Sequence, residues 1–381
     1  MNIGVVFIYL VTFSLMFYFT PVLYHVNASV LNAFMELSTI GLCIFRTKEI
    51  FNNKILLPVF IYMFALFLGA FVLFPKSVSY YFGFASPMLL CLSIKNEDYR
   101  YLKPLFVLIV ALLISNVLIA YYERFSMTHL FEVNAKVNKM DLLSEIYDDV
   151  NDENHYRAMA LFGHPLTNSN ILMFLSFAVY FSKIMPSILN KIFLFVSLLS
   201  IFYAFQSRGA AIISVLLLII VFWRDLMKQN NILKVLELFI IGLIIFYIFE
   251  NIEEIAPRFI ANGADDESSM YRIWTLNFYL SLPFTDKLLG GVENPFGENG
   301  IIMILGEYGM IVGGIFVLSA LIIWWKVLKG LPVIEKLVLY VGFVLLASMN
   351  NNLYYMMVPA MYMITVLFIS RASLYRNLSK K

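Results

Sequence analysis

Apolar stretches of membrane-spanning length recur along the whole chain. A helix needs about 20 mostly apolar residues to cross a bilayer, and twelve stretches approach that length, at 3–23, 27–45, 55–74, 79–94, 104–122, 166–185, 190–206, 210–223, 236–253, 300–325, 337–353 and 355–370. Hydrophobic residues make up 61% of the 381 residues and charged residues only 14%, whereas soluble domains average about 45–50% and about 25%. The sequence therefore predicts an all-α polytopic membrane protein with about 12 transmembrane helices.

Composition also narrows the class of function. The net charge of +2 is too small for a nucleic-acid-binding protein, so we expect no nucleic-acid partner. Cys43 and Cys91 both lie within apolar stretches, and none of the four histidines has another histidine four residues away. Two isolated cysteines do not make a disulfide framework or a thiolate metal site. We therefore expect neither a metal site nor another cofactor.

Lysine and arginine are distributed unevenly between the predicted connections. Alternate connections, beginning with the one that carries Arg46, hold twice as many basic residues as the others. Because basic residues favour the cytoplasmic side, this pattern predicts a single membrane domain, residues 1–381, with both termini cytoplasmic. Two long connections then face outward, at 123–165 and 254–299. Long loops in compact proteins are often functional, although we expect most of the acidic residues in these two to be solvated.

The second outward loop contains a segment with helical periodicity. Its apolar positions share one face of a helix at 269–281, namely Met270, Ile273, Trp274 and Phe278. Such a helix is expected in the membrane interface, with Trp274 as its anchor. Arg272 projects from a different face. It either contacts lipid phosphate groups or belongs to a functional site.

A polar cluster marks the outward end of the seventh predicted span. It consists of Gln206, Ser207 and Arg208, followed by Gly209. An arginine beside nearly continuous apolar helix is costly and is therefore a functional candidate. Its planar guanidinium suits bidentate contact with phosphate. The structural alternative is that the side chain reaches the membrane interface without a specific ligand.

Further polar residues close the first long loop and open the sixth span. Arg157 is followed by His164 and then by Asn168 and Asn170. The amides suit hydrogen bonds with sugar hydroxyls, or alternatively they cap the start of the helix. His164 is a candidate proton carrier, and a hydrogen-bonded structural role is the alternative.

The second long loop ends with Gly297-Glu298-Asn299-Gly300, and Glu307 follows inside the tenth span. A carboxylate within a membrane helix must be paired or protonated. We therefore expect Glu307 to have a structural role, accepting bonds from an arginine or from backbone groups. Glu298 is better placed for chemistry because it lies at the membrane surface. Gly309 and Gly313 are sufficiently explained by close packing of helices.

Several of these motifs occur in a fixed order between residues 155 and 314. They are Arg157 with Gly163-His164-Pro165 and Asn170, Ser207-Arg208-Gly209, Tyr271-Arg272-Ile273-Trp274, Leu289-Gly290-Gly291, Glu298-Asn299, and Glu307-Tyr308-Gly309. This order and its predicted outward location resemble the O-antigen polymerase and O-antigen ligase superfamily, the Wzy and WaaL types. Ligases of that superfamily carry a histidine before the asparagine where this chain has Glu298. The resemblance therefore favours a polymerase over a ligase that joins glycan to lipid A-core.

The resemblance implies a GT-C-like membrane glycosyltransferase of the bacterial inner membrane with a periplasmic active site. Such a polymerase transfers a growing glycan from undecaprenyl diphosphate to the non-reducing end of a lipid-linked repeat unit. Its partners would be that lipid-linked oligosaccharide, membrane lipid and a polysaccharide chain-length regulator. A lipid-linked sugar flippase is the alternative from a different class, but transporters usually place ionisable groups near the bilayer midplane, between repeated halves.

Each candidate residue then has an expected role in glycan transfer. Four arginines are expected to bind the diphosphate, namely Arg208, Arg272, Arg157 and Arg258. Glu298 is expected to be the general base, with His164 as the second candidate. Three amides are expected to bind sugar, namely Asn168, Asn170 and Asn299. Because the arginines neutralise the charge of the leaving group, no metal is required.

Overall fold

The computed structural model describes residues 3–17, 28–131, 156–163, 165–226, 235, 242, 246, 250–251, 267–293, 295, 299–349 and 363–371. Within those residues the secondary structure is helical, and the one β contact is an isolated bridge between Lys329 and Leu331. Three segments are long and apolar enough to cross a membrane, Leu56–Leu73, Tyr101–Ser126 and Gly300–Val327. The chain is therefore an α-helical protein with membrane-spanning character, as the sequence predicts.

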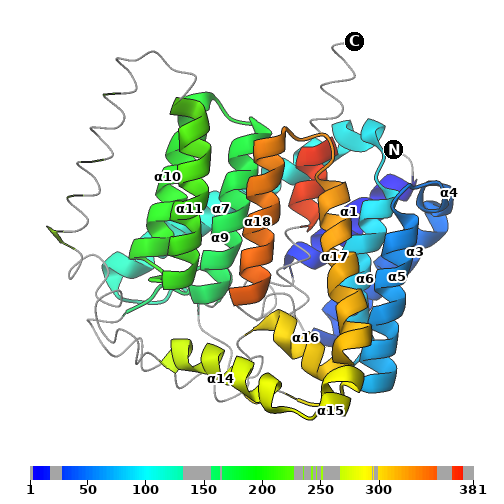
Figure 1. Cartoon of the computed structure of the whole chain (residues 1–381). Helices are drawn as coiled ribbons and strands as arrows, with labels where there is room; N and C mark the ends of the chain where they lie inside the picture. The colour runs from blue at the N-terminus through cyan, green and yellow to red at the C-terminus, as the bar shows by residue number, and fades with distance from the viewer. Residues whose placement is uncertain are drawn as a thin grey trace.

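Most helices run roughly parallel to one another in a bundle (Figure 1). The long elements are α1 (Ile3–Phe17), α3 (Ala28–Phe45), α5 (Leu56–Phe67), α6 (Val78–Ser93), α7 (Tyr99–Ser126), α9 (Pro165–Ser182), α10 (Ser187–Tyr203), α11 (Arg208–Leu226), α17 (Gly314–Val327) and α18 (Val333–Met349). Shorter ones are α4 (Thr47–Phe51), α15 (Phe284–Leu289) and α16 (Gly300–Tyr308), and α14 (Glu267–Ser281) completes the set. The predicted span at 236–253 lies largely outside the described residues, and the span at 355–370 is described from residue 363 onward, where it is helical.

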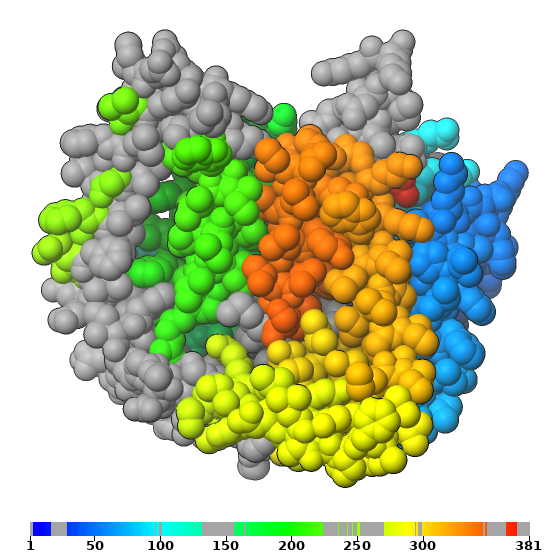
Figure 2. Space-filling model, viewed as in Figure 1, coloured from blue at the N-terminus to red at the C-terminus, as the bar shows by residue number. Residues whose placement is uncertain are grey.

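The two ends of the bundle differ in what covers them. Helices α14, α15 and α16 form a continuous band across one end, which is called the α14 end below (Figure 2). The opposite end carries α4 and the connection between α17 and α18, and it is called the α4 end. There Arg46 is buried and forms two hydrogen bonds with the Asp98 carboxylate, at 3.2 and 3.3 Å. This ion pair ties the end of α3 to the start of α7.

Helix α14 confirms the helix predicted at 269–281. Its inward face carries the fully buried Thr275, and α14 packs against α16 on the side of the bundle. Ile273 and Leu280 are exposed on the opposite face. The exposed face is thus apolar, as expected of a helix in a membrane interface.

The tenth predicted span, 300–325, is interrupted rather than continuous. Gly309 has φ 73° and ψ 166°, which ends α16. A π-helical turn, Gly309–Gly313, follows before α17 begins. Figure 1 shows α16 set at an angle to α17. Helix packing alone was therefore the wrong explanation for Gly309, because this residue is where the chain changes direction.

Candidate functional site

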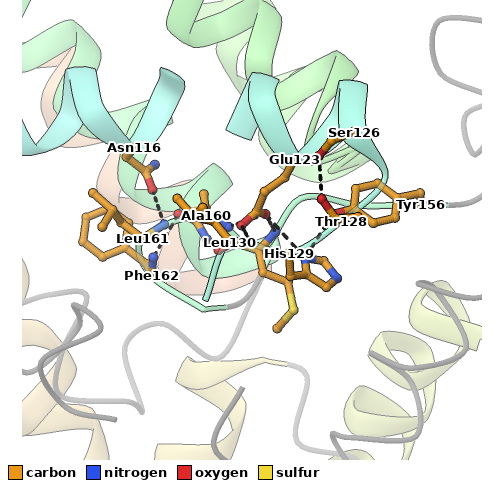
Figure 3. A network of polar contacts seen from close by, with 12 residues as sticks. Asn116, Glu123, Ser126, Thr128, His129, Leu130, Tyr156, Ala160, Leu161 and Phe162 are labelled. Carbon is orange, nitrogen blue, oxygen red and sulfur yellow. Dashed lines mark hydrogen bonds and ion pairs between the residues drawn. The ribbon is translucent and has the colours of Figure 1, made fainter. Parts of the chain in front are cut away.

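A non-helical segment lies inside the bundle at the α14 end. It comprises residues 156–163, called the strap below, and every residue in it is buried. Four consecutive main-chain N–H groups of the strap donate to side chains. Met159 and Ala160 donate to Glu123 Oε2 at 2.8 and 2.9 Å, Leu161 donates to Asn116 Oδ1 at 2.9 Å, and Phe162 donates to Asn168 Oδ1 at 3.4 Å (Figure 3).

These side chains replace the hydrogen bonds that the strap would form in a helix. Unpaired N–H groups that are buried away from water cost about 1–3 kcal/mol each, so buried non-helical backbone needs other groups to satisfy it. Asn116 and Glu123 lie seven residues apart on α7, which puts them on one face of that helix. Asn168 comes from α9 and also donates from Nδ2 to Met159 O, at 2.6 Å. Side chains of two helices, α7 and α9, therefore hydrogen-bond to the strap.

Glu123 also fixes the chain that leaves α7. Its Oε1 accepts the main-chain N–H of Leu130 at 3.0 Å, and His129 Nδ1 lies 3.4 Å from Oε2. The imidazole stacks on the Tyr156 ring and lies 3.1 Å from the Tyr156 hydroxyl. Burial, and then the Glu123 charge, raise the pKa of Tyr156. Tyr156 therefore remains a neutral phenol at physiological pH.

The strap meets the polar cluster between α10 and α11. Ala158 donates its N–H to Ala204 O at 2.9 Å, and Arg157 Nε donates to Phe205 O at 2.9 Å. Gln206 follows with φ 46°, an uncommon value for a residue that is not glycine. Arg208 then begins α11 and is half-buried. Two of the arginines predicted to bind diphosphate thus lie on adjoining segments.

Arg272 lies on α14, across the same end of the bundle (Figure 1). Its side chain is half-buried, three residues from the fully buried Thr275 and on the same side of the helix. Trp274 and Ile273 are exposed. Arg272 therefore belongs to the inward side of α14, separate from the exposed apolar face.

Glu307 has a lysine as its ionic partner. The carboxylate is 2% exposed, and its Oε1 lies 3.2 Å from Lys76 Nζ. The ammonium of Lys76 also lies over the Phe74 ring, 4.1 Å from its centroid. The carboxylate of Glu307 is thus paired with a lysine, and this ion pair links the segment after α5 to α16.

The asparagines predicted to bind sugar have other contacts. Asn168 is fully buried, and both ends of its amide hold the strap. Asn170 is 2% exposed. Asn299 caps α16, with Oδ1 accepting from Ile302 N at 3.1 Å and Nδ2 donating to Ser348 O. We therefore correct the assignment of Asn168 from sugar binding to a structural role. Asn299 is half-buried, and its sugar contact stays a prediction beside its role as a cap. Sugar binding by Asn170 stays a prediction.

Three predicted site residues, His164, Arg258 and Glu298, lie outside the described residues. The structure instead adds Glu123, Asn116 and Lys76, which the sequence did not single out. Glu123 lies in the loop predicted at 123–165, in which most of the acidic residues are expected to be solvated. In the structure α7 continues to Ser126, and Glu123 is fully buried.

The signal for Glu123 was its position directly after an apolar stretch. A carboxylate there lies within the next turn if the helix continues, and it then has to be paired or hydrogen-bonded. Asn116, inside the same stretch, carried the corresponding signal of a polar residue within an apolar helix.

The positions of three arginines suit the binding of an anion. Arg157 and Arg208 lie on adjoining segments, and Arg272 lies at the same end of the bundle. Among the described residues, no group of three His, Cys, Asp or Glu side chains is placed to hold a metal ion.

Comparisons with protein-family models, curated proteins and solved structures find no match to this chain.

Proposed function

We propose that this protein is a membrane polysaccharide polymerase that transfers a growing glycan from a lipid diphosphate to a lipid-linked repeat unit. The observation that carries the proposal is that Arg157 bonds the segment leading into Arg208, while Arg272 lies on α14 at the same end of the bundle (Figure 1). Guanidinium groups at one end of a membrane bundle suit a diphosphate, whose charge stays at the membrane surface while its lipid lies in the bilayer. The motif resemblance to the Wzy and WaaL types supports the same function.

The proposed reaction breaks the bond between the donor sugar's anomeric carbon and the diphosphate oxygen. A hydroxyl of the acceptor sugar attacks that carbon and loses its proton to Glu298, with His164 as the second candidate base. The bond electrons leave with the lipid diphosphate. Arg208 and Arg272 stabilise the developing charge, with Arg157 and Arg258 in support. Such electrostatic stabilisation is usually the largest contribution to catalysis.

The proposal includes an orientation. Twelve spans with both termini cytoplasmic put the α14 end on the periplasmic side of a bacterial inner membrane. Lys329 lies in a connection predicted to be cytoplasmic, and Ser370 is the last residue of the predicted span that leads to the cytoplasmic C-terminus. Ser370 Oγ donates to Lys329 O at 2.8 Å. That contact supports the prediction that these two segments lie on the same side of the membrane.

Cysteine labelling in intact cells tests the orientation. Cysteines introduced beside Asp149 and Asp266 are expected to react with a membrane-impermeant thiol reagent added outside. A cysteine beside Lys329 is expected to react only after the membrane is permeabilised. Reaction at Lys329 from outside would contradict the orientation and the periplasmic site.

Reconstitution tests the activity itself. The purified chain in lipid vesicles, incubated with undecaprenyl-diphosphate-linked repeat units, is expected to produce a ladder of lengthened glycans. A ligase would instead join the glycan to lipid A-core only when that acceptor is supplied. A flippase would move the lipid-linked unit across the vesicle membrane without lengthening it. A ladder is therefore the result that distinguishes the polymerase from both alternatives.

Replacing Glu298 with glutamine tests the general base. Glutamine keeps the shape of the side chain but loses its basicity, so elongation is expected to fall by at least about 100-fold. Binding of the lipid-linked substrate, measured by its retention on the immobilised protein, is expected to be nearly unchanged. Near-normal elongation in Glu298→Gln would transfer the role of base to His164.

A further inference from the structure

We propose that Glu123 is a positioning residue, which holds the strap so that Arg157 stays fixed against the segment leading into Arg208. This inference rests on the proposed function, in which Arg157 and Arg208 bind the diphosphate. It adds to that function a residue on α7 that contacts neither substrate nor either arginine in the described contacts. Glu123 acts through the main chain of residues 159 and 160.

Glu123 itself is unsuited to chemistry. Its side chain is fully buried, and its two oxygens together accept N–H groups from Leu130, Met159 and Ala160, with His129 Nδ1 also in range. A carboxylate with this many donors is stabilised in its ionised form and has no exposed oxygen for a sugar hydroxyl. The geometry therefore points to a structural action on the strap rather than to proton transfer.

The strap transmits the position of Glu123 over a short stretch of chain. Met159, held by Glu123, is two residues from Arg157, whose Nε bonds Phe205 O, and Ala158 between them bonds Ala204 O. Residues 157, 158 and 159 are therefore each held by one hydrogen bond. If residues 159 and 160 are released, Arg157 is held less firmly. The carbonyls of residues 204 and 205, which lie just before Arg208, then lose their fixed partners.

Arg124 stabilises the part of the strap that precedes Arg157. Its Nη1 donates to Tyr156 O at 2.9 Å, and its guanidinium carbon lies 5.2 Å from the centroid of the Tyr203 ring. The residue before Arg157 and the last residue of α10 are thus both in contact with one side chain of α7. Neighbouring residues on α7, Glu123 and Arg124, hold the strap on either side of Arg157.

A cysteine-protection experiment tests the position of the strap without using activity. Met159 is 2% exposed, so Met159→Cys, in a chain where Cys43 and Cys91 are replaced by alanine, is expected to resist a membrane-impermeant thiol reagent. Adding Glu123→Gln is expected to increase the labelling rate by at least about tenfold. The neutral amide oxygen is a weaker acceptor than the carboxylate for the two strap N–H groups, and the amide NH2 cannot accept the N–H on its other side. Unchanged protection in the double variant, or labelling before Glu123 is changed, would overturn the proposal.

A double-mutant cycle tests whether the released strap acts through Arg157. Glu123→Gln alone is expected to lower kcat/KM for elongation by about tenfold, but by less than about twofold when Arg157 is already alanine. Equal losses in both backgrounds would mean that Glu123 only stabilises the fold. Asn190→Ala is the matched control, since Asn190 is also buried and donates to a main-chain carbonyl, that of Tyr180. Its effect is expected to be the same with and without Arg157.

The two experiments separate this inference from the proposed function. If Arg157→Ala elongates normally, the diphosphate role of Arg157 is wrong and the proposal that Glu123 serves catalysis fails with it. The labelling result would then still report whether Glu123 holds the strap. If Arg157→Ala is impaired and Glu123→Gln is not, the function stands and the positioning role is wrong.

Discussion

Replacing Arg208 with lysine is expected to lower the rate of elongation by about 1000-fold while leaving the protein folded. Loss of one preorganised donor to a developing oxyanion costs about 2.7–4 kcal/mol, which corresponds to 100-fold to 1000-fold in kcat. Lysine keeps the positive charge of Arg208 but loses the planar fork that contacts two phosphate oxygens at once. The measurement is the rate at which the glycan ladder appears, per amount of folded protein.

Arg46→Lys is the matched control for this prediction. Arg46 also makes a two-pronged contact, with the Asp98 carboxylate, but it lies at the α4 end. Losing that contact is expected to lower the melting temperature without changing the elongation rate of the folded fraction. Full elongation by Arg208→Lys would contradict bidentate diphosphate binding at this position. An equal loss of elongation in both variants would show that the assay reports folding instead.

The sequence predicted those features that depend on local composition. Apolar length identified the helical membrane class, and helical periodicity identified α14 within the second long loop. Both signals are local, since each is read from fewer than about 25 consecutive residues. The polar cluster at Gln206–Arg208 was found for the same reason, because an arginine next to an apolar stretch is visible without knowing what packs against it.

The strap was not predictable because its hydrogen bonds join residues far apart in the chain. Glu123 and Met159 are separated by 36 positions, and Arg157 and Phe205 by 48. Spacing alone predicted that Asn168 either caps a helix or binds a sugar. Only the fold shows that Asn168 holds Met159 and Phe162 instead. Long-range contacts of this kind decide whether a buried polar residue is structural or functional.

The same limit applied to the glycines of the Leu289-Gly290-Gly291 motif. In the fold this segment lies against the break between α16 and α17. Gly291 N donates to Glu307 O at 2.8 Å, and Val292 N donates to Gly306 O at 3.2 Å. These bonds satisfy carbonyls that lose their helical partners where α16 ends. The motif is therefore explained by the helix break, which the sequence did not reveal.

Gly309 makes that break possible, and we expect Gly309→Ala to be strongly destabilising. Its backbone, at φ 73° and ψ 166°, lies in a region that is essentially restricted to glycine. A Cβ at Gly309 would lie 2.5 Å from Leu288 O and 2.7 Å from Gly290 N, both main-chain atoms. The backbone strain alone costs about 1–3 kcal/mol. The contacts add to it because the contacted atoms belong to the main chain, which cannot rotate away as a side chain can.

Gly314→Ala, five residues further on, separates this strain from a general effect of added volume. Gly314 has helical φ and ψ of −64° and −43°, and its Cβ would meet nothing within 4 Å. Alanine there is expected to leave the melting temperature unchanged or to raise it, since alanine is favoured over glycine within helices by about 1 kcal/mol. Gly309→Ala is expected to lower the melting temperature sharply and to reduce the yield of folded protein. Similar melting temperatures for the two variants would mean that α16 and α17 form one continuous helix, and the contact of residues 288–292 with the break would then be wrong.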